Sequence, residues 1–436
     1  MKIVRIYLYN YIITIRGVCQ WETCAFKKII VCLLCAIDFV AIFLYNILIS
    51  ITRQKGYLMK NEITEVLKKL IAIDSANAFL VAGGQGESEM LSCIKDYLQK
   101  LGINASFEET GDGHNNLFAT IPGSGGGKPI TLCAHVDTVG YSTWRDSALN
   151  AVVSGSKLTG LGACDDKGHC AAMMLVAKEL AKGKNRLQGD VHLAFVADEE
   201  GESRGSFAYV KAHMPEAVLI LAPAPLHRIK VSHQGFGWLK IRVNGQAAHG
   251  SSDAIARMGE VIVRLQRNQQ EVFAKNPHPL NGETLYHTGT INGGSDFATY
   301  PDFCELGIEV GMQPGETIGN RIQEIKEIFK EVKAMYPDFE GSVDTVVARN
   351  PFETKGAEEL YQVLSEEVEK VLGVKAEAVG ENSWCDAQIF QDAGFPTLGT
   401  GALGGNIHAF GEWVSLPQLE RLINVLMGTL KRYCAS

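Results

Sequence analysis

The sequence predicts an α/β protein with a second, ferredoxin-like unit inserted into its main domain. Apolar runs at residues 129–133, 191–197 and 218–222 have the length of buried strands and end in polar or proline-rich segments. Between residues 237 and 348 the pattern changes to strand, helix, strand, strand, helix, strand, which is the ferredoxin-like order. An α/β pattern resumes near residue 350. We therefore expect a main domain that is discontinuous in the chain.

The composition is that of a globular chain long enough for two cores. Of the 436 residues, 46% are apolar and 21% are charged, and the net charge is −8. This negative charge, without any basic run, argues against a nucleic-acid partner. Four of the eleven cysteines lie in the first 58 residues, and the others lack metal or redox spacing. We expect reduced packing cysteines and a cytoplasmic protein.

The first 58 residues differ from the rest. Residues 29–51 are nearly all apolar and long enough to cross a bilayer, although Asp38 would be costly in mid-span. Two interpretations stay open: a membrane anchor, or translated upstream sequence before a true start at Met59. The amphipathic helix that opens at Met59 favours the second. Residues 1–58 are therefore expected to be dispensable.

The main domain is expected to begin with helices and short strands and to reach its first polar cluster at His135. This histidine and Asp137 follow the strand at 129–133, at the strand end where open α/β sheets hold ligands. Asp137 lies on the same face and is placed to fix the tautomer of His135 for a metal. An isolated surface histidine would explain one such pair equally well. The preceding elements are expected as helices at 61–73 and 88–101 and strands at 103–107 and 116–120.

Two further acidic segments occupy comparable places. Asp165 and Asp166 lie in a glycine-rich loop before a helix at 171–181, and the preference of acids for helix N-termini explains Asp166 better than Asp165. Glu199 and Glu200 belong to a charge run directly after a core strand, where a solvated loop is the ordinary explanation. Because adjacent side chains point to opposite sides, one glutamate can bind a metal while the other faces a substrate.

Domain boundaries follow from the change in pattern. We expect an N-terminal extension at 1–58, a catalytic domain in two parts at 59–233 and 350–436, and the inserted unit at 234–349. The inserted unit is expected to hold strands at 237–243, 285–291, 304–310 and 342–348 and helices at 252–272 and 317–335. The last part is expected to hold a helix at 358–372, a strand at 396–399, a glycine loop at 399–405 and a helix at 416–433.

Four residues at strand ends or adjoining loops have the side chains of a metal site: His135, Asp165, Glu200 and His408. This mixture of imidazole and carboxylate suits zinc or a similar divalent ion. Glu199, beside the ligand Glu200, is placed to act as a general base on water.

Six segments resemble motifs of the M20 family of metallopeptidases and amidohydrolases, which includes acetylornithine deacetylase, succinyl-diaminopimelate desuccinylase, aminoacylase and peptidase T. The resemblance covers the chain from about Met59 to its end. The segments are 134–139 (AHVDTV), 165–168 (DDKG), 198–201 (DEEG), 247–251 (AAHGS), 314–317 (PGET) and 408–413 (HAFGEW).

The resemblance implies a zinc-peptidase-like catalytic domain with a lid that also forms a homodimer, and a centre for two Zn²⁺ ions that Co²⁺ or Mn²⁺ can replace. Asp165 would bridge the ions, His135 would hold one, and Glu200 and His408 would hold the other. The substrate would be an N-acyl amino acid or a short peptide.

The catalytic roles also come from the resemblance. Glu199 would be the general base, and Asp137 would orient His135. His249, on the lid, would stabilise the oxyanion and contact the substrate. Gly404 and Gly405 are expected to contact the substrate as well.

Two positions depart from the family pattern. The family's fifth carboxylate ligand is replaced at Ala222, and no Asp or Glu occurs between Glu216 and Asp253. The His135 ion is therefore expected to bind weakly unless His227 or His233 completes its site. At Gly311 relatives place an arginine that binds the substrate carboxylate.

Two functions are compatible with these features. The first is a metal-dependent hydrolase that cleaves an amide bond with metal-activated water and Glu199 as base. The second is a weakly active or inactive relative that keeps the fold and one metal for binding or assembly, which the residues at Ala222 and Gly311 favour. The intact pair Glu199 and Glu200 favours the first.

Overall fold

The computed structural model describes residues 61–435 apart from 79, 82, 112, 184–186 and 247–252. The chain divides into Met1–Met59 and Lys60–Ser436, and all described residues belong to the second unit. The apolar segment at 29–51 and His249 lie outside the described residues. Within the described part, no helix combines the length and the apolar character needed to cross a membrane.

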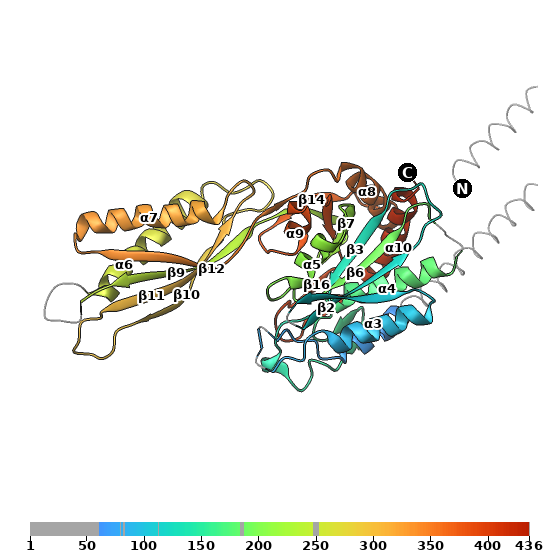
Figure 1. Ribbon diagram of the computed structural model, residues 1–436, viewed down its shortest axis with the longest axis horizontal. Coiled ribbons are helices and arrows are strands. Elements are labelled where there is room, and N and C mark those ends of the chain that lie inside the picture. Colours follow the sequence, from blue (N-terminus) through green and yellow to red (C-terminus); the bar gives the residue numbers. More distant parts are fainter. Residues whose placement is uncertain are drawn as a thin grey trace, which may run out of the picture. The chain divides into compact units, whose positions relative to one another are not determined.

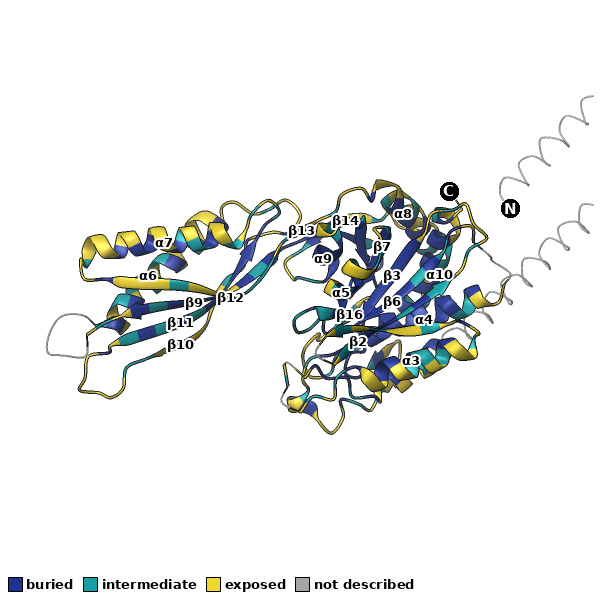
Figure 2. Ribbon diagram, in the orientation of Figure 1, coloured by how far each residue is buried: buried dark blue, intermediate teal, exposed yellow. Residues whose placement is uncertain are grey.

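A nine-stranded mixed sheet forms the core of the main domain (Figure 1). At its centre, β3 (Ile130–His135) lies parallel between β6 (Val191–Val196) and β7 (Ala217–Leu221), and these three strands are almost completely buried (Figure 2). They are the three predicted apolar strands. Because the strands are parallel, their carboxyl ends meet at one edge, where the predicted polar clusters follow.

The strand order of this sheet is β1-β2-β6-β3-β7-β15-β8-β13, with β14 paired to β8. The outer strands are β1 (Ala105–Gly111), β2 (His114–Ile121), β8 (Arg228–His233), β13 (Phe352–Glu353), β14 (Glu377–Glu381) and β15 (Thr397–Thr400).

Helices pack on the sheet in two groups. In the first, α10 contacts α4 and α8, and α4 contacts α3; in the second, α5 contacts α9. Their bounds are α3 Ser88–Lys100, α4 Lys167–Ala181, α5 Arg204–Ala212, α8 Glu358–Leu372, α9 Ala387–Asp392 and α10 Leu416–Tyr433. Residues 61–71 form a further helix.

The inserted unit is ferredoxin-like, as predicted. Its four strands pair antiparallel in the order β10-β11-β9-β12, and α6 and α7 pack together on the sheet (Figure 1). Apolar residues of both helices and of β9 and β11 form its own core. The elements are β9 Gly235–Asn244, α6 Ala254–Asn268, β10 Tyr286–Gly293, β11 Phe303–Met312, α7 Ile318–Met335 and β12 Glu340–Arg349. The predicted end of α6 continues as one π-helical turn, Gln269–Phe273.

A small sheet joins two loops that are far apart in the sequence. Its order is β16-β17-β5-β4, with β16 Gly404–Gly405, β17 Trp413–Ser415, β5 Lys157–Thr159 and β4 Val152–Ser154. Trp413 pairs with Thr159 in this sheet. The loop that carries His408 is thereby held beside the loop that leads to Asp165.

The seven cysteines among the described residues are all free. Five are buried, and Cys93 and Cys385 are half-buried. Their packing matches the expectation from their spacing in the sequence.

Candidate metal centre and active site

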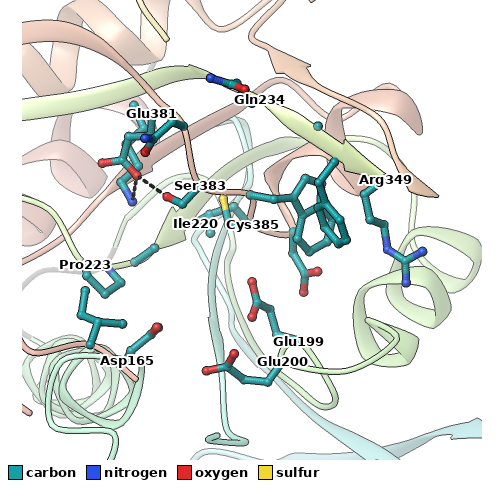
Figure 3. A pocket seen from close by; sticks show the side chains of 18 of the residues that line it. Asp165, Glu199, Glu200, Ile220, Pro223, Gln234, Arg349, Glu381, Ser383 and Cys385 are labelled. Carbon is teal, nitrogen blue, oxygen red and sulfur yellow. Dashed lines mark hydrogen bonds and ion pairs between the residues drawn. The ribbon is translucent and has the colours of Figure 1, made fainter. Parts of the chain in front are cut away.

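The carboxyl ends of β3, β6 and β7 open into a cavity of about 1030 Å³ (Figure 3). Its wall includes all four predicted ligands and Glu199. Glu199 and Glu200 extend into it from the loop after β6, and Glu200 points toward Asp165 (Figure 3). The structure therefore brings together residues that are up to 273 positions apart, from His135 to His408.

Asp165 lies between the two histidines. Its Oδ1 is 3.0 Å from His135 Nε2, and its Oδ2 is 3.3 Å from His408 Nε2. His408 Nε2 is also 2.9 Å from Glu200 Oε1. Donor atoms of Asp165, Glu200 and His408 all lie within 4.8 Å of one another. Three donors of these types are the protein share of a catalytic zinc site.

His135 is oriented by the segment that follows it. Its Nδ1 lies 3.1 Å from the carbonyl oxygen of Asp137 and 3.4 Å from that residue's Oδ1, so Nε2 faces the cavity. This arrangement agrees with the expected orienting role of Asp137, although the backbone oxygen is the nearer partner.

Asp137 also anchors the loop after β6, which the sequence did not indicate. Its fully buried carboxylate accepts hydrogen bonds from the backbone N–H groups of Glu199 (3.1 Å) and Glu200 (3.0 Å) and from Asn77 Nδ2 (2.8 Å). It thereby fixes the loop that carries the general-base candidate and a ligand.

Glu199 differs from its neighbours because, among the described residues, none donates a hydrogen bond to its carboxylate. Burial raises the pKa of this carboxyl well above its ordinary value, although His135 opposes the shift. An unengaged carboxylate of raised pKa is suited to accepting a proton from water.

The remaining charges show how strongly the ligands interact. Hydrogen bonds to Asp165 and then Glu200 raise the pKa of His408 to about 10. Burial favours the protonated form of Asp165, but hydrogen bonds from His135 and His408 outweigh it and lower the pKa. The centre therefore favours positive charge between its carboxylates, as a cation site must.

Two supporting residues near the centre were not assigned roles from the sequence. Asp166 begins α4 but does not cap it; its carboxylate instead accepts hydrogen bonds from His169 Nδ1 and from the backbone N–H of His135. His169 Nε2 accepts a hydrogen bond of 2.9 Å from the N–H of Ala402. The spacing of Asp166 and His169, three residues apart at a helix start, was the available signal.

Glu412 is the second. Its buried carboxylate accepts hydrogen bonds from the backbone N–H groups of Gly162 (2.8 Å), Cys164 (2.8 Å) and Asp165 (2.9 Å). Burial raises the pKa of this group to about 7. Glu412 thus ties the His408 loop to the Asp165 loop.

Comparison with known proteins identifies the family of this chain. The model of the peptidase family M20/M25/M40 matches residues 131–432, more than half of the chain. The chain belongs to this family. It is a hydrolase of the class that acts on amide and peptide bonds. It is 26% identical to an acetylornithine deacetylase of Proteus mirabilis over 385 residues, which cover 85% of this chain and 96% of that protein.

Solved structures of M20 proteins share the fold. Aminopeptidase PepT from Bacillus cereus has a TM-score of 0.69 at 18% identity, covering 85% of this chain and 98% of that chain. Human carnosine dipeptidase 1 has a TM-score of 0.71 at 14% identity, covering 88% and 98%. The Bacillus subtilis YXEP protein, described as a dinuclear metal-binding peptidase of the M20 family, has a TM-score of 0.68 at 16% identity, covering 87% and 99%.

Against the family pattern, the second metal position is incomplete in this chain. Ala222, where M20 relatives are expected to carry a carboxylate, lines the cavity as a buried methyl group. His227 and His233 do not complete the site, since neither lines the cavity. The ring nitrogens of His233 lie 2.8 Å and 3.1 Å from two backbone carbonyl oxygens, and burial lowers its pKa to about 4.

Gly311 lies in the cavity wall, and a larger side chain there would have to displace Gln234. A Cβ at Gly311 would lie 2.3 Å from Oε1 of Gln234 and 3.0 Å from the backbone nitrogen of Leu285. Gln234 occupies this space because its amide binds Leu285 N–H and the carbonyl oxygens of Asn281 and Glu283. The expected substrate-binding arginine is therefore absent, and the Gln234 side chain occupies the space beside Gly311.

The remaining predicted substrate residues stay predictions. His249 lies outside the described residues. Gly404 and Gly405 do not line the cavity; a Cβ would meet Cys164 Sγ at Gly404 and the Trp413 indole at Gly405. Close packing therefore explains why both positions are glycine.

Proposed function

We propose that this M20 protein hydrolyses the amide bond of an N-acyl amino acid or a short peptide, with Glu199 as general base. The observation that carries the proposal is the arrangement of Glu199 beside the donor set Asp165, Glu200 and His408. The three donors would hold the metal ion, and in the same cavity no residue that the structure describes donates a hydrogen bond to the Glu199 carboxylate. The family membership and the relative described as a deacetylase support an amide substrate.

The donor set fits one divalent ion of the zinc type. Such an ion supplies Lewis acidity, polarising the amide carbonyl and making water easier to deprotonate. The chain's own groups do the proton transfer: the Glu199 carboxylate takes a proton from the attacking water and gives it to the departing amine. The backbone bond from Glu199 N–H to Asp137 keeps that carboxylate in place.

A second function has specific support and stays an alternative. Ala222 leaves the His135 position short of a ligand, and Gly311 removes the usual carboxylate contact. A relative that binds a metal without efficient turnover would show both features.

Turnover of a panel separates the two. Purified protein is stripped of metal and then assayed with N-acetyl amino acids, dipeptides and tripeptides in the presence of Zn²⁺, Mn²⁺ or Co²⁺. We expect hydrolysis of at least one class of substrate, abolished by a chelator and restored by metal. Tight binding of one ion with no turnover for any substrate and metal would favour the alternative.

A further inference from the structure

A buried lysine lies on the incomplete side of the metal centre. Lys230 is on β8 and only 7% exposed, and its ammonium forms an ion pair of 2.7 Å with Glu381 Oε2. Its stem lies over Gly399 of β15, where an added Cβ would be 2.9 Å from Lys230 Cβ and 3.1 Å from Cδ. Because Gly399 has no side chain, the aliphatic part of Lys230 can pass over it and reach the cavity.

Lys230 lines the same cavity as the segment that lacks the expected carboxylate. Lys230, Ala222, Pro223, His135 and Asp165 all line the same cavity. Ala222 follows β7, and its N–H donates to Thr400 at the end of β15, the strand over which the lysine stem lies. The segment without the expected carboxylate is therefore hydrogen-bonded to the strand over which the lysine stem lies.

The electrostatics agree with this placement. Burial lowers the pKa of Lys230, but Glu381 and, more weakly, Asp165 outweigh burial and raise it. The side chain is therefore charged at neutral pH, and its charge is close enough to Asp165 to interact with it. Glu381 offsets the cost of burying the ammonium, and a second divalent ion beside the ammonium would be repelled by it.

We propose that the Lys230 ammonium takes the place of the second metal ion, so that the centre holds one divalent ion beside a fixed lysine cation. The inference rests on the proposed metal centre at Asp165, Glu200 and His408. It accounts for two features together. Ala222 has no carboxylate to bind a second metal ion, and the Lys230 ammonium supplies a positive charge in place of that ion.

Asp166, Glu199 and Glu200 also form donor groups with His135, and none of them removes the need for this cation, since Glu200 belongs to the ion at His408 in the proposed centre. The Asp166 carboxylate is already bound by His169 and by the backbone N–H of His135. Glu199 would lose its unengaged state if it became a ligand. Two donors, His135 and Asp165, are fewer than the three that zinc sites use.

The test counts metal ions per chain rather than activity. Metal-free protein is titrated with Zn²⁺ and Mn²⁺ by calorimetry, and bound metal is measured by elemental analysis after dialysis. Four proteins are compared: the unchanged chain, Lys230→Met, Ala222→Glu/Lys230→Met and the matched control Ala222→Glu/Lys230→Arg. The control has the new carboxylate but keeps a buried cation.

We expect one ion per chain in the unchanged protein and in Lys230→Met, because removing the cation alone adds no ligand. Ala222→Glu/Lys230→Met should bind two ions, with the second at least tenfold tighter than in the arginine control. If the glutamate prevents folding, as circular dichroism would show, Ala222→Asp/Lys230→Met replaces it.

Two ions of similar affinity in the unchanged chain would overturn the inference, as would equal binding of the second ion by the methionine and arginine double variants. A folded methionine double variant that still binds one ion would also count against it. The absence of any bound ion in the unchanged chain would instead overturn the proposed metal centre, so the two failures are distinguishable.

Discussion

At the scale of single residues, Asp137 shows how one buried carboxylate organises several parts of the site. It faces His135 and accepts the N–H groups of Glu199 and Glu200. Burial favours its protonated form, but His135 and Asn77 outweigh burial and lower the pKa. The orientation of a metal ligand and the position of the base therefore depend on the same ionised group.

Glu199→Gln should keep metal binding and lose turnover. The substitution preserves shape but removes the proton acceptor, so kcat should fall by about 10²- to 10⁴-fold. Metal content and kcat are measured on the same preparation. The matched control is Glu200→Gln, which removes a ligand 2.9 Å from His408 and should lose metal. Parallel loss of metal and activity in Glu199→Gln would mean that the roles of the two glutamates are exchanged.

Metal affinity should depend on pH through His408. Its pKa of about 10, raised by Asp165 and Glu200, means that the metal-free protein carries a proton there at neutral pH. A metal needs the neutral ring, so binding must release that proton. Between pH 7 and pH 9 the apparent affinity should therefore rise with pH, by about tenfold per unit for one displaced proton.

Calorimetry in buffers of different ionisation enthalpy counts the released protons. As a control, His213→Gln changes a histidine that is 3.0 Å from Glu108 and does not line the cavity, and it should not alter the count. Binding at pH 8 without proton release would contradict the assigned role of His408.

At the scale of elements, the loop at 404–413 is the piece that completes the centre. It is held by the pairing of β16 and β17 and by the three hydrogen bonds that Glu412 accepts from the loop at 162–165. His408 has a left-handed backbone, with φ of +59°, and is half-exposed. Its position therefore depends on the anchor at Glu412 more than on packing of its own side chain.

Glu412→Gln should weaken both stability and metal binding. An amide NH₂ in place of one oxygen faces a backbone N–H and cannot accept its hydrogen bond, which should cost about 1–3 kcal/mol in the free energy of unfolding. Metal affinity should fall by about 10- to 100-fold, because the loops that carry His408 and Asp165 lose one of the hydrogen bonds that hold them together.

Glu367→Gln is the control for stability. Glu367 is also buried, but it pairs with Lys370 on the same helix, α8, and with Arg432 of α10, far in the sequence from any predicted ligand. It should lower stability without changing metal affinity. Equal loss of affinity in the two variants would show that Glu412 has no specific effect on the centre.

The elements that sequence patterns missed were polar ones. β8 (Arg228–His233) has only two apolar residues, Ile229 and Val231, yet it lies inside the central sheet because Lys230 is neutralised by Glu381. β1 was expected to end at Phe107 and runs to Gly111, since an edge strand in solvent tolerates acidic residues. Periodicity detects burial of apolar side chains, and it cannot detect a strand stabilised by a buried ion pair.

At the scale of the whole molecule, the features that could be predicted are those that leave a local signal in the sequence, either a hydrophobic period or a characteristic side chain. The βαββαβ unit and the strands before His135 and Glu199 follow from periodicity, and residue type and resemblance predicted four ligands that the structure places in one cavity. Contacts between distant segments did not follow, because nothing local links Glu412 to Gly162 or Lys230 to Glu381. In the proposed centre these contacts hold the ligand loops and supply the buried cation.

The inserted unit is also expected to make the protein a homodimer, through its sheet edge or its helices. β10 is an edge strand whose residues are mostly exposed, and Ile291 on it is 58% exposed. On α6, Val263 is 61% exposed. Both are apolar side chains on surfaces that a second copy would cover.

Sedimentation of the unchanged protein and of two charge variants tests this expectation. The unchanged chain should sediment as a dimer. Ile291→Asp should dissociate the dimer if the sheet edge is the interface, because the pairing would bury an unpaired charge. Val263→Asp should do so if the helices are the interface, and each variant serves as the control for the other. A fully active monomer of the unchanged chain would contradict the expectation, since the predicted contribution of His249 to catalysis would then have to come from the same subunit.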